Sequence, residues 1–383
     1  MQPTDPAPAP SPCFHGGAFF EAINTRFDDL SRSAGVVNAD VLDAWFPPAP
    51  AVLQALQEHL PWLLRTSPPT DCGGFLEVVS DVRGVPASCL LPGAGSSDLM
   101  FLALPRWLTP SSRVTLLDPT YGEYRHILDH VVGCEVRALP LRRGDGYEVD
   151  MDEVLEAASS SDLLILVNPN SPTGRHVPRS RLVRLLDELP LRTRVWIDET
   201  YVEYVGAEQS LESDVVHRPN AVVCKSMSKV YSLSGARAAY LCGSPELLEP
   251  LRRFVPPWAM SLPAQVAAVA ALQSPDYYAA RYQQTHRLRD GLADALGALP
   301  GVEVLRGVAN YLLCHLDDGL PTAAEVVARC REVGVYVRDA EGMGRGMGPR
   351  ALRTAVKSAA DNERIVTAIR DAVRPRAAAA LSR

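Results

Sequence analysis

The sequence predicts an α/β fold in which a mainly parallel sheet lies between helices and a smaller α+β domain is attached. The first observation is a set of segments that are apolar throughout and rich in β-branched residues; they are residues 114–118, 163–169, 194–199 and 221–226. The second is the helical spacing of the segments between them, as in residues 180–189. Strands that are apolar on both faces and alternate with helices are typical of parallel sheets covered on both sides.

The third observation is a change of pattern after residue 275. A long helical stretch at 277–299 is followed by short strands and further helices; the strands are expected at 301–305, 310–316 and 334–339, and the helices at 323–333 and 362–373. We therefore expect a small domain made of residues 35–62 and 275–383, a large ligand-binding domain at 63–274, and an N-terminal arm or lid at 1–34. The segment 41–60 is assigned to the small domain because it is too short to fold alone.

The composition excludes several classes of protein. The 383 residues are 47% hydrophobic and 22% charged, and the net charge of −7 argues against a nucleic-acid or acidic-membrane partner. No apolar run reaches the roughly 18 residues that span a bilayer. The Pro- and Ala-rich beginning of the chain lacks the pattern of a secretory signal. We therefore expect a cytoplasmic protein without a membrane partner.

The cysteines and lysines of the chain indicate which kinds of site to expect. None of the eight cysteines belongs to a CxxC pair, which predicts reduced thiols and no metal site. The chain contains only three lysines, Lys225, Lys229 and Lys357. A lysine that is retained where lysine is scarce more often needs its amine, so these positions are candidates for amine chemistry.

Glycine and hydroxyl residues come directly before the helical run at 99–108. In Gly93–Asp98, Gly95 lets the backbone approach an anion, and Ser96 and Ser97 add hydroxyl donors. The free N–H groups and the positive end of the following helix favour phosphate. The segment lacks the full phosphate-loop and dinucleotide motifs. A glycine turn with a serine cap therefore explains it equally well by itself.

Two further motifs follow strand-like segments. Tyr121, in Asp-Pro-Thr-Tyr-Gly, is able to lie flat on a planar ligand, although a core aromatic is the simpler interpretation. Asn170 and Ser171 belong to a turn with two prolines and a glycine, which needs no function as a turn. In a doubly wound sheet, however, ligands bind at the C-terminal ends of the strands, and both motifs lie at such ends.

Asp198 comes out of a buried strand just before Glu199-Thr200-Tyr201. An unpaired carboxylate in that position is costly, so it needs a cationic partner. A protonated pyridine nitrogen would serve.

Lys229 follows the last apolar strand in Ser226-Met227-Ser228-Lys229. An amine flanked by small hydroxyl residues can form an imine with an aldehyde. Arg237, eight residues on, offers a bidentate fork to a phosphate. The alternatives are a solvated lysine and a surface arginine.

Together these motifs form the set of groups that pyridoxal 5′-phosphate (PLP) requires. Their order and spacing resemble the class I/II aminotransferase superfamily of fold type I, and specifically its histidinol-phosphate aminotransferase and threonine-phosphate decarboxylase branch. The resemblance runs from about residue 35 to about residue 370. It implies a fold-type I PLP enzyme whose large domain binds the cofactor, and a homodimer with a shared active site.

The resemblance also implies roles for individual residues. Lys229 matches the Schiff-base lysine, Asp198 the partner of the pyridinium nitrogen, and Tyr201 a donor to the ring hydroxyl. The remaining cofactor contacts are expected from Gly95, Ser96, Ser97, Tyr121, Asn170, Ser171, Ser226, Ser228 and Arg237. Arg353 matches the arginine that holds the substrate α-carboxylate, and the other matched substrate positions are Arg338 and Asn310.

The sequence departs from the family at the substrate end. Ala44–Pro47 stands where an Asn-Pro-aromatic-Gly loop is usual, Ser171 replaces an asparagine, and residues 64–68 lack the tyrosine that reaches the partner's phosphate. In the changed loop, Trp45 and Phe46 either stack on a flat part of the substrate or belong to the core. His15, in a His-Gly-Gly similar to that of threonine-phosphate decarboxylases, either closes over the site or lies in an ordinary turn.

Three functions follow from these observations. The leading hypothesis is an aminotransferase that moves an amino group through an internal aldimine on Lys229. The second, motivated by the departures, is a PLP enzyme of a natural-product pathway that diverts the quinonoid to β/γ-elimination, to decarboxylation or to carbon–carbon bond formation, including bond formation on S-adenosylmethionine. The third is a non-catalytic regulator that retains the fold, although no helix-turn-helix extension is recognised in the sequence.

Overall fold

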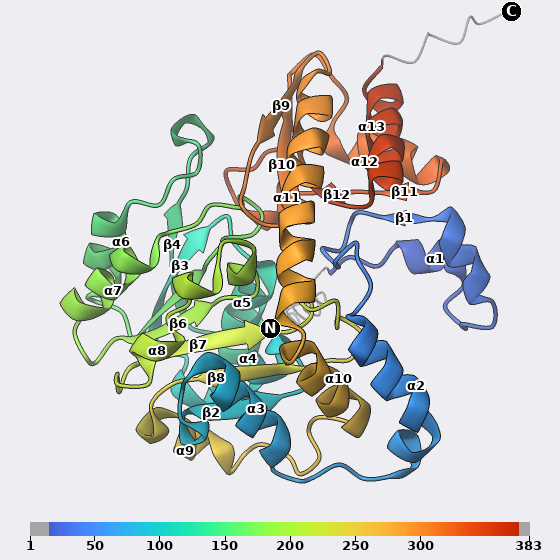
Figure 1. Cartoon of the computed structure of the whole chain (residues 1–383). Helices are drawn as coiled ribbons and strands as arrows, with labels where there is room; N and C mark the ends of the chain where they lie inside the picture. Colours follow the sequence, from blue (N-terminus) through green and yellow to red (C-terminus); the bar gives the residue numbers. More distant parts are fainter. Residues whose placement is uncertain (1–14, 375–383) are drawn as a thin grey trace, which may run out of the picture.

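A seven-stranded sheet forms the centre of the larger part of the molecule (Figure 1). The computed structural model describes residues 15–374. The strands β2-β8-β7-β6-β5-β3-β4 lie side by side, with the bounds Leu90–Gly93, Ala239–Cys242, Ala221–Ser226, Arg194–Asp198, Leu163–Val167, Arg113–Asp118 and Glu135–Pro140. β8 is antiparallel to both of its neighbours, and the other pairs are parallel. The predicted α/β fold with a mainly parallel sheet is confirmed.

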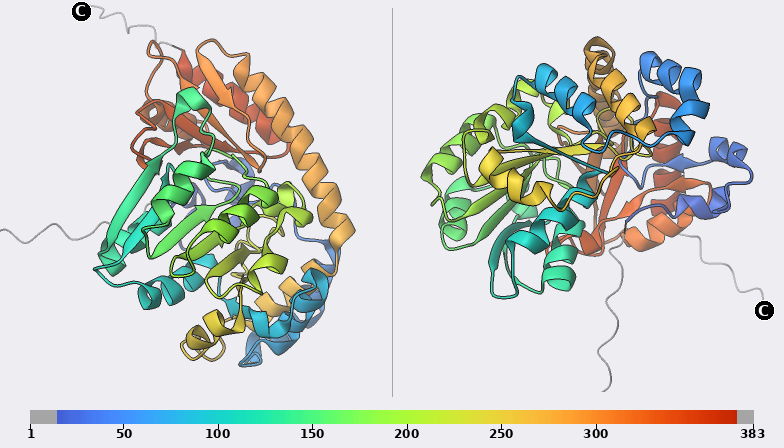
Figure 2. Two further views of the ribbon diagram at one scale, coloured as in Figure 1. Left: turned by 90° about the vertical axis from the view of Figure 1, so that its left-hand side faces the viewer. Right: turned by 90° about the horizontal axis from the view of Figure 1, so that it is seen from below.

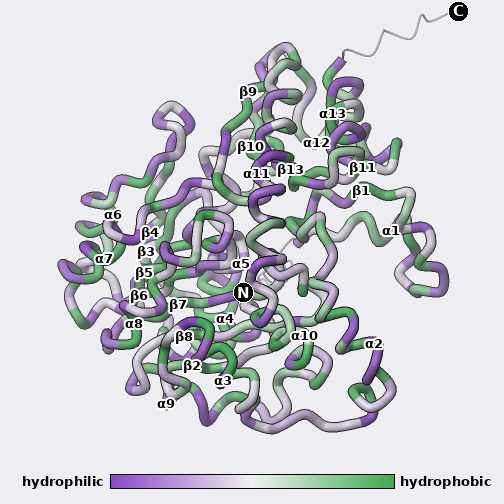
Figure 3. Tube along the Cα trace, in the orientation of Figure 1, coloured by the Kyte–Doolittle hydropathy of each residue, from purple (hydrophilic) through white to green (hydrophobic). Residues whose placement is uncertain are grey.

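Both faces of this sheet are buried, as the apolar strands predict. Along β5, Leu164 and Leu166 belong to one hydrophobic cluster, whereas Leu163, Ile165 and Val167 belong to the other. Successive side chains of a strand point to opposite faces, so the sheet lies between two apolar layers. Figure 3 shows the hydrophobic segments in the central strands and many hydrophilic ones in the outer loops.

Helices supply these two layers. One cluster includes residues of α3, α6, α7, α8 and α10, which span Gly73–Arg83, Met151–Ala158, Arg179–Glu188, Glu212–Val215 and Leu262–Leu272. The other includes residues of α4, α5 and α9, which span Ser96–Trp107, Gly122–His126 and Pro245–Arg252. The alternation of strands and helices along the chain therefore produces a sheet that is covered on both sides.

A smaller antiparallel sheet forms the second part of the molecule. Its order is β12-β13-β10-β9, with the bounds Arg338–Asp339, Ala351–Ala355, Tyr311–Leu316 and Val302–Leu305. The helices α12 and α13, Ala323–Glu332 and Ala359–Val373, pack against each other. The long helix α11, Pro275–Gly297, runs along one side of the molecule from the larger part to the smaller part (Figure 2).

The single strand expected at residues 334–339 is wrong. Two short strands occupy this segment: β11, Val335–Tyr336, pairs in parallel with β1, Val37–Asn38, whereas β12 joins the four-stranded sheet. The chain changes sheets at Val337, and the apolar alternation continues across that change. The pattern alone therefore does not reveal the break.

Residues 35–62, which are expected to belong to the small domain, contact both parts of the molecule. β1 pairs with β11 beside the smaller sheet, but α2, Pro50–Arg65, packs against α10 of the larger part. Figure 1 shows α2 and α10 side by side, away from the smaller sheet. Residues 50–62 therefore make helix contacts with the larger part. The division of the chain into domains stays a prediction.

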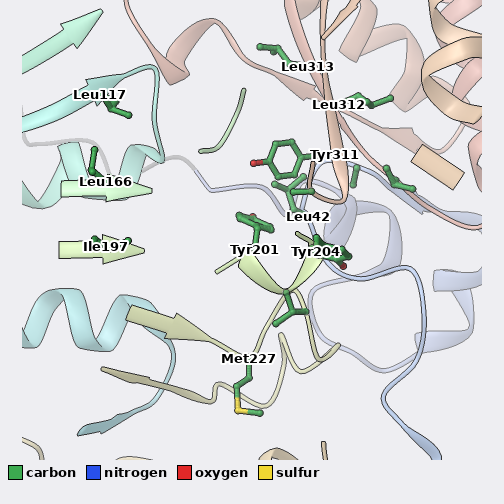
Figure 4. Packing of buried hydrophobic residues seen from close by; sticks show 14 of the residues in the cluster. Leu42, Leu117, Leu166, Ile197, Tyr201, Tyr204, Met227, Tyr311, Leu312 and Leu313 are labelled. Atoms are coloured by element: carbon green, nitrogen blue, oxygen red, sulfur yellow. The ribbon is translucent and has the colours of Figure 1, made fainter. Parts of the chain in front are cut away.

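The two parts meet around a group of aromatic side chains. The Tyr201 ring lies 5.2 Å from the Tyr311 ring at an angle of 74°, and Figure 4 shows Leu42 and Tyr204 close to them. The segment before β1 contains α1, Phe19–Ile23, and a 3-10 helix, Leu30–Gly35. Across residues 15–374, none of the helices combines the length and apolarity that crossing a bilayer requires.

Candidate active site

A cavity of about 280 Å³ opens at the C-terminal ends of β5, β6 and β7. The last residues of these strands, Val167, Asp198 and Ser226, line it. The cavity collects most of the site residues predicted from separate motifs; they are His15, Ser96, Ser97, Tyr121, Ser171, Asp198, Tyr201, Ser226, Ser228, Lys229, Arg237, Arg338 and Arg353. The carboxyl edge of the parallel sheet is where such a site is expected.

Lys229 presents its amine to this cavity. Its Nζ lies 2.7 Å from Asp43 Oδ1, and its backbone carbonyl accepts a hydrogen bond from the Tyr204 hydroxyl at 3.0 Å. Burial raises the pKa of Asp43, but the Lys229 ammonium and further donors outweigh burial and hold that pKa below its usual value. Asp43 was not predicted from the sequence, because it lies 186 residues away in a segment without a recognisable motif.

An anion cradle lies where α4 begins. Gly95 precedes the helix with φ +97°, and a Cβ at this position would collide with the Arg237 guanidinium. The Arg237 Nη1 lies 3.0 Å from the Ser234 carbonyl oxygen and 3.4 Å from Ser228 Oγ. The positive end of a helix, a guanidinium and nearby hydroxyls are donors that suit a phosphate.

Asp198 is a buried carboxylate that accepts only neutral hydrogen bonds. Its Oδ1 accepts from the Thr200 amide at 2.9 Å and from the Thr200 hydroxyl at 2.6 Å, and its Oδ2 accepts from the Tyr124 hydroxyl at 2.7 Å. Burial raises its pKa, although these hydrogen bonds oppose the rise. No cation within residues 15–374 forms an ion pair with it. The predicted need for a cationic partner therefore holds in the folded protein.

Tyr121 lies at the mouth of the cavity beside a carboxylate that the sequence reasoning missed. Its hydroxyl donates to Glu123 Oε2 at 2.7 Å, and Ser97 Oγ donates to the same oxygen at 2.8 Å. The His15 ring stacks on Tyr121 at 5.9 Å and 28°, and His15 Nε2 lies 3.7 Å from Glu123 Oε2. Glu123 follows Tyr121 by two residues, directly after the Asp-Pro-Thr-Tyr-Gly motif, so its proximity to Tyr121 along the chain was the available signal. His15, in the segment before β1, therefore lines the cavity beside Tyr121.

Two arginines lie together at the substrate end. Arg338 and Arg353 face each other across the β12–β13 pair. Arg338 Nε lies 2.6 Å from Asp40 Oδ1, whereas Arg353 donates to the Asp40 carbonyl at 2.9 Å and to Ser171 Oγ at 3.3 Å. Burial and the nearby Arg338 charge lower the pKa of Arg353. Within the described residues, Arg353 Nε has no hydrogen-bond partner, so a buried donor remains for a ligand.

Asn170 and Asn310 do not line the cavity. The Asn170 amide nitrogen donates to the Pro119 carbonyl and to Thr173 Oγ1, and its oxygen accepts from Thr120 Oγ1. These bonds engage both polar atoms of Asn170 within the protein, and the cofactor contact expected of it stays a prediction. Asn310 is fully buried and donates to the Leu42 carbonyl at 2.9 Å, so it supports the cavity wall from behind.

Trp45 and Phe46 also lie outside the cavity. Phe46 is buried and makes edge contacts with Tyr278 and Tyr282, so it follows the core alternative. Trp45 donates from Nε1 to Thr285 Oγ1 at 2.8 Å. Because α11 supplies these partners, the two aromatics fasten the changed loop to that helix, and the substrate contacts expected of them stay a prediction.

The donor set fits the predicted cofactor. The Gly95–Arg237 cradle suits the phosphate, the unpaired Asp198 carboxylate suits the protonated ring nitrogen, and the Lys229 amine suits the aldehyde. Tyr201, whose pKa burial raises, keeps a protonated hydroxyl in the same cavity for the ring oxygen.

Known proteins show the family to which this fold belongs. A family model described as aminotransferase class I and II matches residues 48–369. A histidinol-phosphate aminotransferase of Roseiflexus castenholzii is 31% identical over 297 residues, 76% of this chain and 78% of that protein. A threonine-phosphate decarboxylase of Salmonella typhimurium is 30% identical over 329 residues, 84% of this chain and 86% of that protein.

A solved structure shares the fold. The crystal structure of histidinol-phosphate aminotransferase from Sinorhizobium meliloti, in complex with PLP, superposes with a TM-score of 0.80 at 22% identity. The superposition covers 88% of this chain and 91% of that one.

Proposed function

The chain belongs to the class I and II aminotransferase family, whose enzymes depend on PLP, and from that premise we propose that it transfers the amino group of an amino acid with a free α-carboxylate. The observation that carries the proposal is Arg353. It is buried, lines the same cavity as Lys229 and keeps Nε without a partner among residues 15–374. Such a guanidinium suits a substrate carboxylate.

Each side chain of the site has its own role in the proposed reaction. PLP, when bound, supplies an electron sink that makes the substrate Cα–H acidic. Arg353 holds the carboxylate, and the Lys229 amine takes the Cα proton and returns it as a general base and acid. Asp198 keeps a proton on the ring nitrogen, and Arg237 with the α4 N-terminus holds the phosphate.

Spectroscopic titration of the purified enzyme with a panel of amino acids tests this proposal. We expect a responding amino acid to convert the visible cofactor band to the shorter-wavelength band of pyridoxamine phosphate and to yield a keto acid. Lys229→Ala should lose turnover by about 10²- to 10⁴-fold, because the proton carrier is gone. Full turnover by the PLP-loaded Lys229→Ala variant would contradict the assignment.

A second candidate function keeps the cofactor and changes the outcome. The contact between Arg353 and Ser171, at the position where the family has asparagine, supports it. This second candidate function comprises decarboxylation, β- or γ-elimination, or carbon–carbon bond formation, including reaction with S-adenosylmethionine. A threonine-phosphate decarboxylase among the relatives points the same way. One-to-one amino transfer to 2-oxoglutarate or pyruvate would exclude this candidate.

We also propose a cytoplasmic homodimer. The exposed face of α2 carries Leu53, Leu60, Trp62 and Leu64, and neighbouring exposed apolar side chains are typical of a covered surface. The described cysteines are all free thiols, in keeping with a reducing compartment. Sedimentation velocity should give twice the chain mass of 41.5 kDa, and Trp62→Glu should shift the protein toward the monomer.

A further inference from the structure

Two of the chain's three lysines share one aspartate. Lys229 Nζ lies 2.7 Å from Asp43 Oδ1, and Lys357 Nζ donates to the backbone carbonyl of the same Asp43 at 2.9 Å. Asp43 belongs to the loop before α2, and Lys357 follows β13 and Arg353. The loop and the end of β13 therefore bring a second ammonium group beside the predicted catalytic amine.

The buried position of Lys357 is unusual for a lysine. Its residue is 9% exposed, and among residues 15–374 its Nζ forms no ion pair with a carboxylate. Burial and the repulsion of Lys229 lower the pKa of Lys357 to about 8, although Asp43 opposes the shift. A buried ammonium whose hydrogen bond goes to a carbonyl, without a carboxylate in ion-pair contact among the described residues, is costly. Packing alone does not explain why a chain with so few lysines keeps one here.

Other charged groups also face this pair. Asp198, Tyr201, Arg237 and Arg353 line the same cavity as Lys229, and Asp361 of α13 acts on Lys357. These groups stay unchanged when Asp43 or Lys357 is replaced. Differences between the two variants and the wild type therefore isolate the two charges.

We propose that Asp43 and Lys357 are positioning residues that set the protonation of the Lys229 amine with opposite signs, Asp43 by holding the ammonium form and Lys357 by opposing it. The inference rests on the proposed function in taking Lys229 as the proton carrier. An amine acts as a base only after it has lost its proton, so a general base needs its pKa near the working pH. Asp43 orients the Lys229 amine and stabilises its protonated form. The Lys357 charge weakens that stabilisation.

The small number of lysines makes a direct test feasible. In the full-length chain labelled with ¹³C-lysine and freed of cofactor, NMR resolves three Cε signals, and pH titration gives a midpoint for each. Asp43→Asn should move the Lys229 midpoint down by about one pH unit, the smaller end of the effect of a neighbouring opposite charge. Lys357→Met should move the same midpoint up, by about half a unit because its charge is farther away.

Two conservative variants serve as matched controls. Asp43→Glu and Lys357→Arg keep the charges and should leave the Lys229 midpoint within about 0.3 units of the wild type. In the PLP-loaded chain, the pH midpoint of the visible absorbance band should shift in the same opposite directions for Asp43→Asn and Lys357→Met.

The proposal is overturned if both neutral variants shift the midpoint in the same direction, or if neither shifts it while circular dichroism shows an intact fold. If Asp43→Asn does not fold, Lys357→Met alone decides: an upward shift supports the proposal and no shift overturns it. The NMR midpoints do not depend on turnover. A wrong reaction assignment would therefore appear only in the amino-acid panel, and a wrong assignment of these two residues only in the titrations.

Discussion

Lys225 and Lys229 lie four residues apart on one segment and occupy opposite environments. Lys225, in β7, is buried with its Nζ 2.8 Å from Glu203, 3.4 Å from Glu199 and 3.7 Å from Glu212. Lys229 has Asp43 as its one ion-pair partner among the described residues and lines the cavity. The scarcity of lysine pointed to both residues equally.

The cluster around Lys225 is a closed network. Arg83 completes it, with Nη2 2.8 Å from Glu203 Oε1 and Nε 3.6 Å from Glu212 Oε2. The Tyr240 hydroxyl donates to Glu212 Oε1 at 2.8 Å. Each member of this buried carboxylate cluster, defined as Arg83, Glu199, Glu203, Glu212 and Lys225, has an oppositely charged partner, although Glu203 Oε2 lacks a hydrogen-bond partner among the described residues. Such a network holds β7 and the segment after β6 in place.

The comparison shows how one segment serves two purposes. Around Lys225 each charge is paired with an opposite charge inside the protein, which is a structural arrangement. Around Lys229, Asp198 and Arg353 keep unsatisfied binding capacity that faces the cavity, which is a functional one. Both environments are built around a lysine, so the chemical type of the residue does not distinguish the structural environment from the functional one. The partners that distant segments supply distinguish them.

The largest expected effect is the loss of stability in Lys225→Met. Removing one cation leaves three buried carboxylates with only Arg83 as a positive partner, and breaking a buried ion pair costs about 3–5 kcal/mol. The matched variant Lys229→Met should cost less than about 1 kcal/mol, because its partner Asp43 is partly exposed. Urea unfolding monitored by circular dichroism measures both. Similar losses in the two variants would remove the distinction between the environments.

Asp198→Asn should separate activity from stability. We expect kcat to fall by about 10²- to 10³-fold, the cost of removing one preorganised electrostatic contact. The melting temperature should hold or rise, because burial already raises the pKa of Asp198 and disfavours its charged form. In the matched variant Glu203→Gln the stability should fall instead, since Glu203 pairs with both Arg83 and Lys225. A large loss of stability in Asp198→Asn would contradict this division.

The buried carboxylate cluster should also make stability depend on pH. Burial and the Glu212 charge raise the pKa of Glu199 from 4.5 to about 7, although Lys225 opposes the shift. Between these values the folded protein keeps a proton that the unfolded chain has lost. The free energy of unfolding should therefore fall as the pH rises from about 4.5 to about 7, by up to about 3 kcal/mol.

Urea titrations at pH 5 and pH 8 measure this dependence. Glu199→Gln cannot titrate, so it should show a smaller difference between the two pH values than the wild type. Asp43 changes the free energy of unfolding in the opposite direction. Its pKa lies below the usual value, so its contribution to stability is lost as the pH falls. An equal pH dependence in the wild type and Glu199→Gln would place the titrating group elsewhere.

The sequence predicts the strand-end residues well for a physical reason. Lys229, Asp198 and Arg237 belong to short motifs directly after apolar strands, and in a parallel sheet those ends meet at one edge. The central strands themselves are predicted to within two residues at each end. The strands β2, β4 and β8 were not foreseen: β2 and β8 have only four residues each, β2 ends in Pro-Gly, and β4 is partly exposed and not apolar throughout.

The partners of these residues are less predictable. Asp43 meets Lys229 across 186 residues of sequence, and nothing local marks such a pairing. Asn170 and Phe46 show the converse difficulty: a polar turn residue and an aromatic residue have the same appearance whether they contact a ligand or the protein itself. Tertiary packing decides between these alternatives, and it is not encoded in any short segment.

The smallest expected effect lies at the exposed end of the cavity. His15 is about half exposed, and its contacts with Tyr121 and Glu123 are a ring stack at 5.9 Å and an ion pair at 3.7 Å. Exposed pairs contribute about 0–1 kcal/mol, so His15→Ala should raise KM by no more than about fivefold and leave kcat and the melting temperature unchanged. Steady-state kinetics with the amino acid identified by the panel measure this change. A fall in kcat comparable to that of Asp198→Asn would instead make His15 a participant in the chemistry and extend the functional environment of Lys229 to the N-terminal arm.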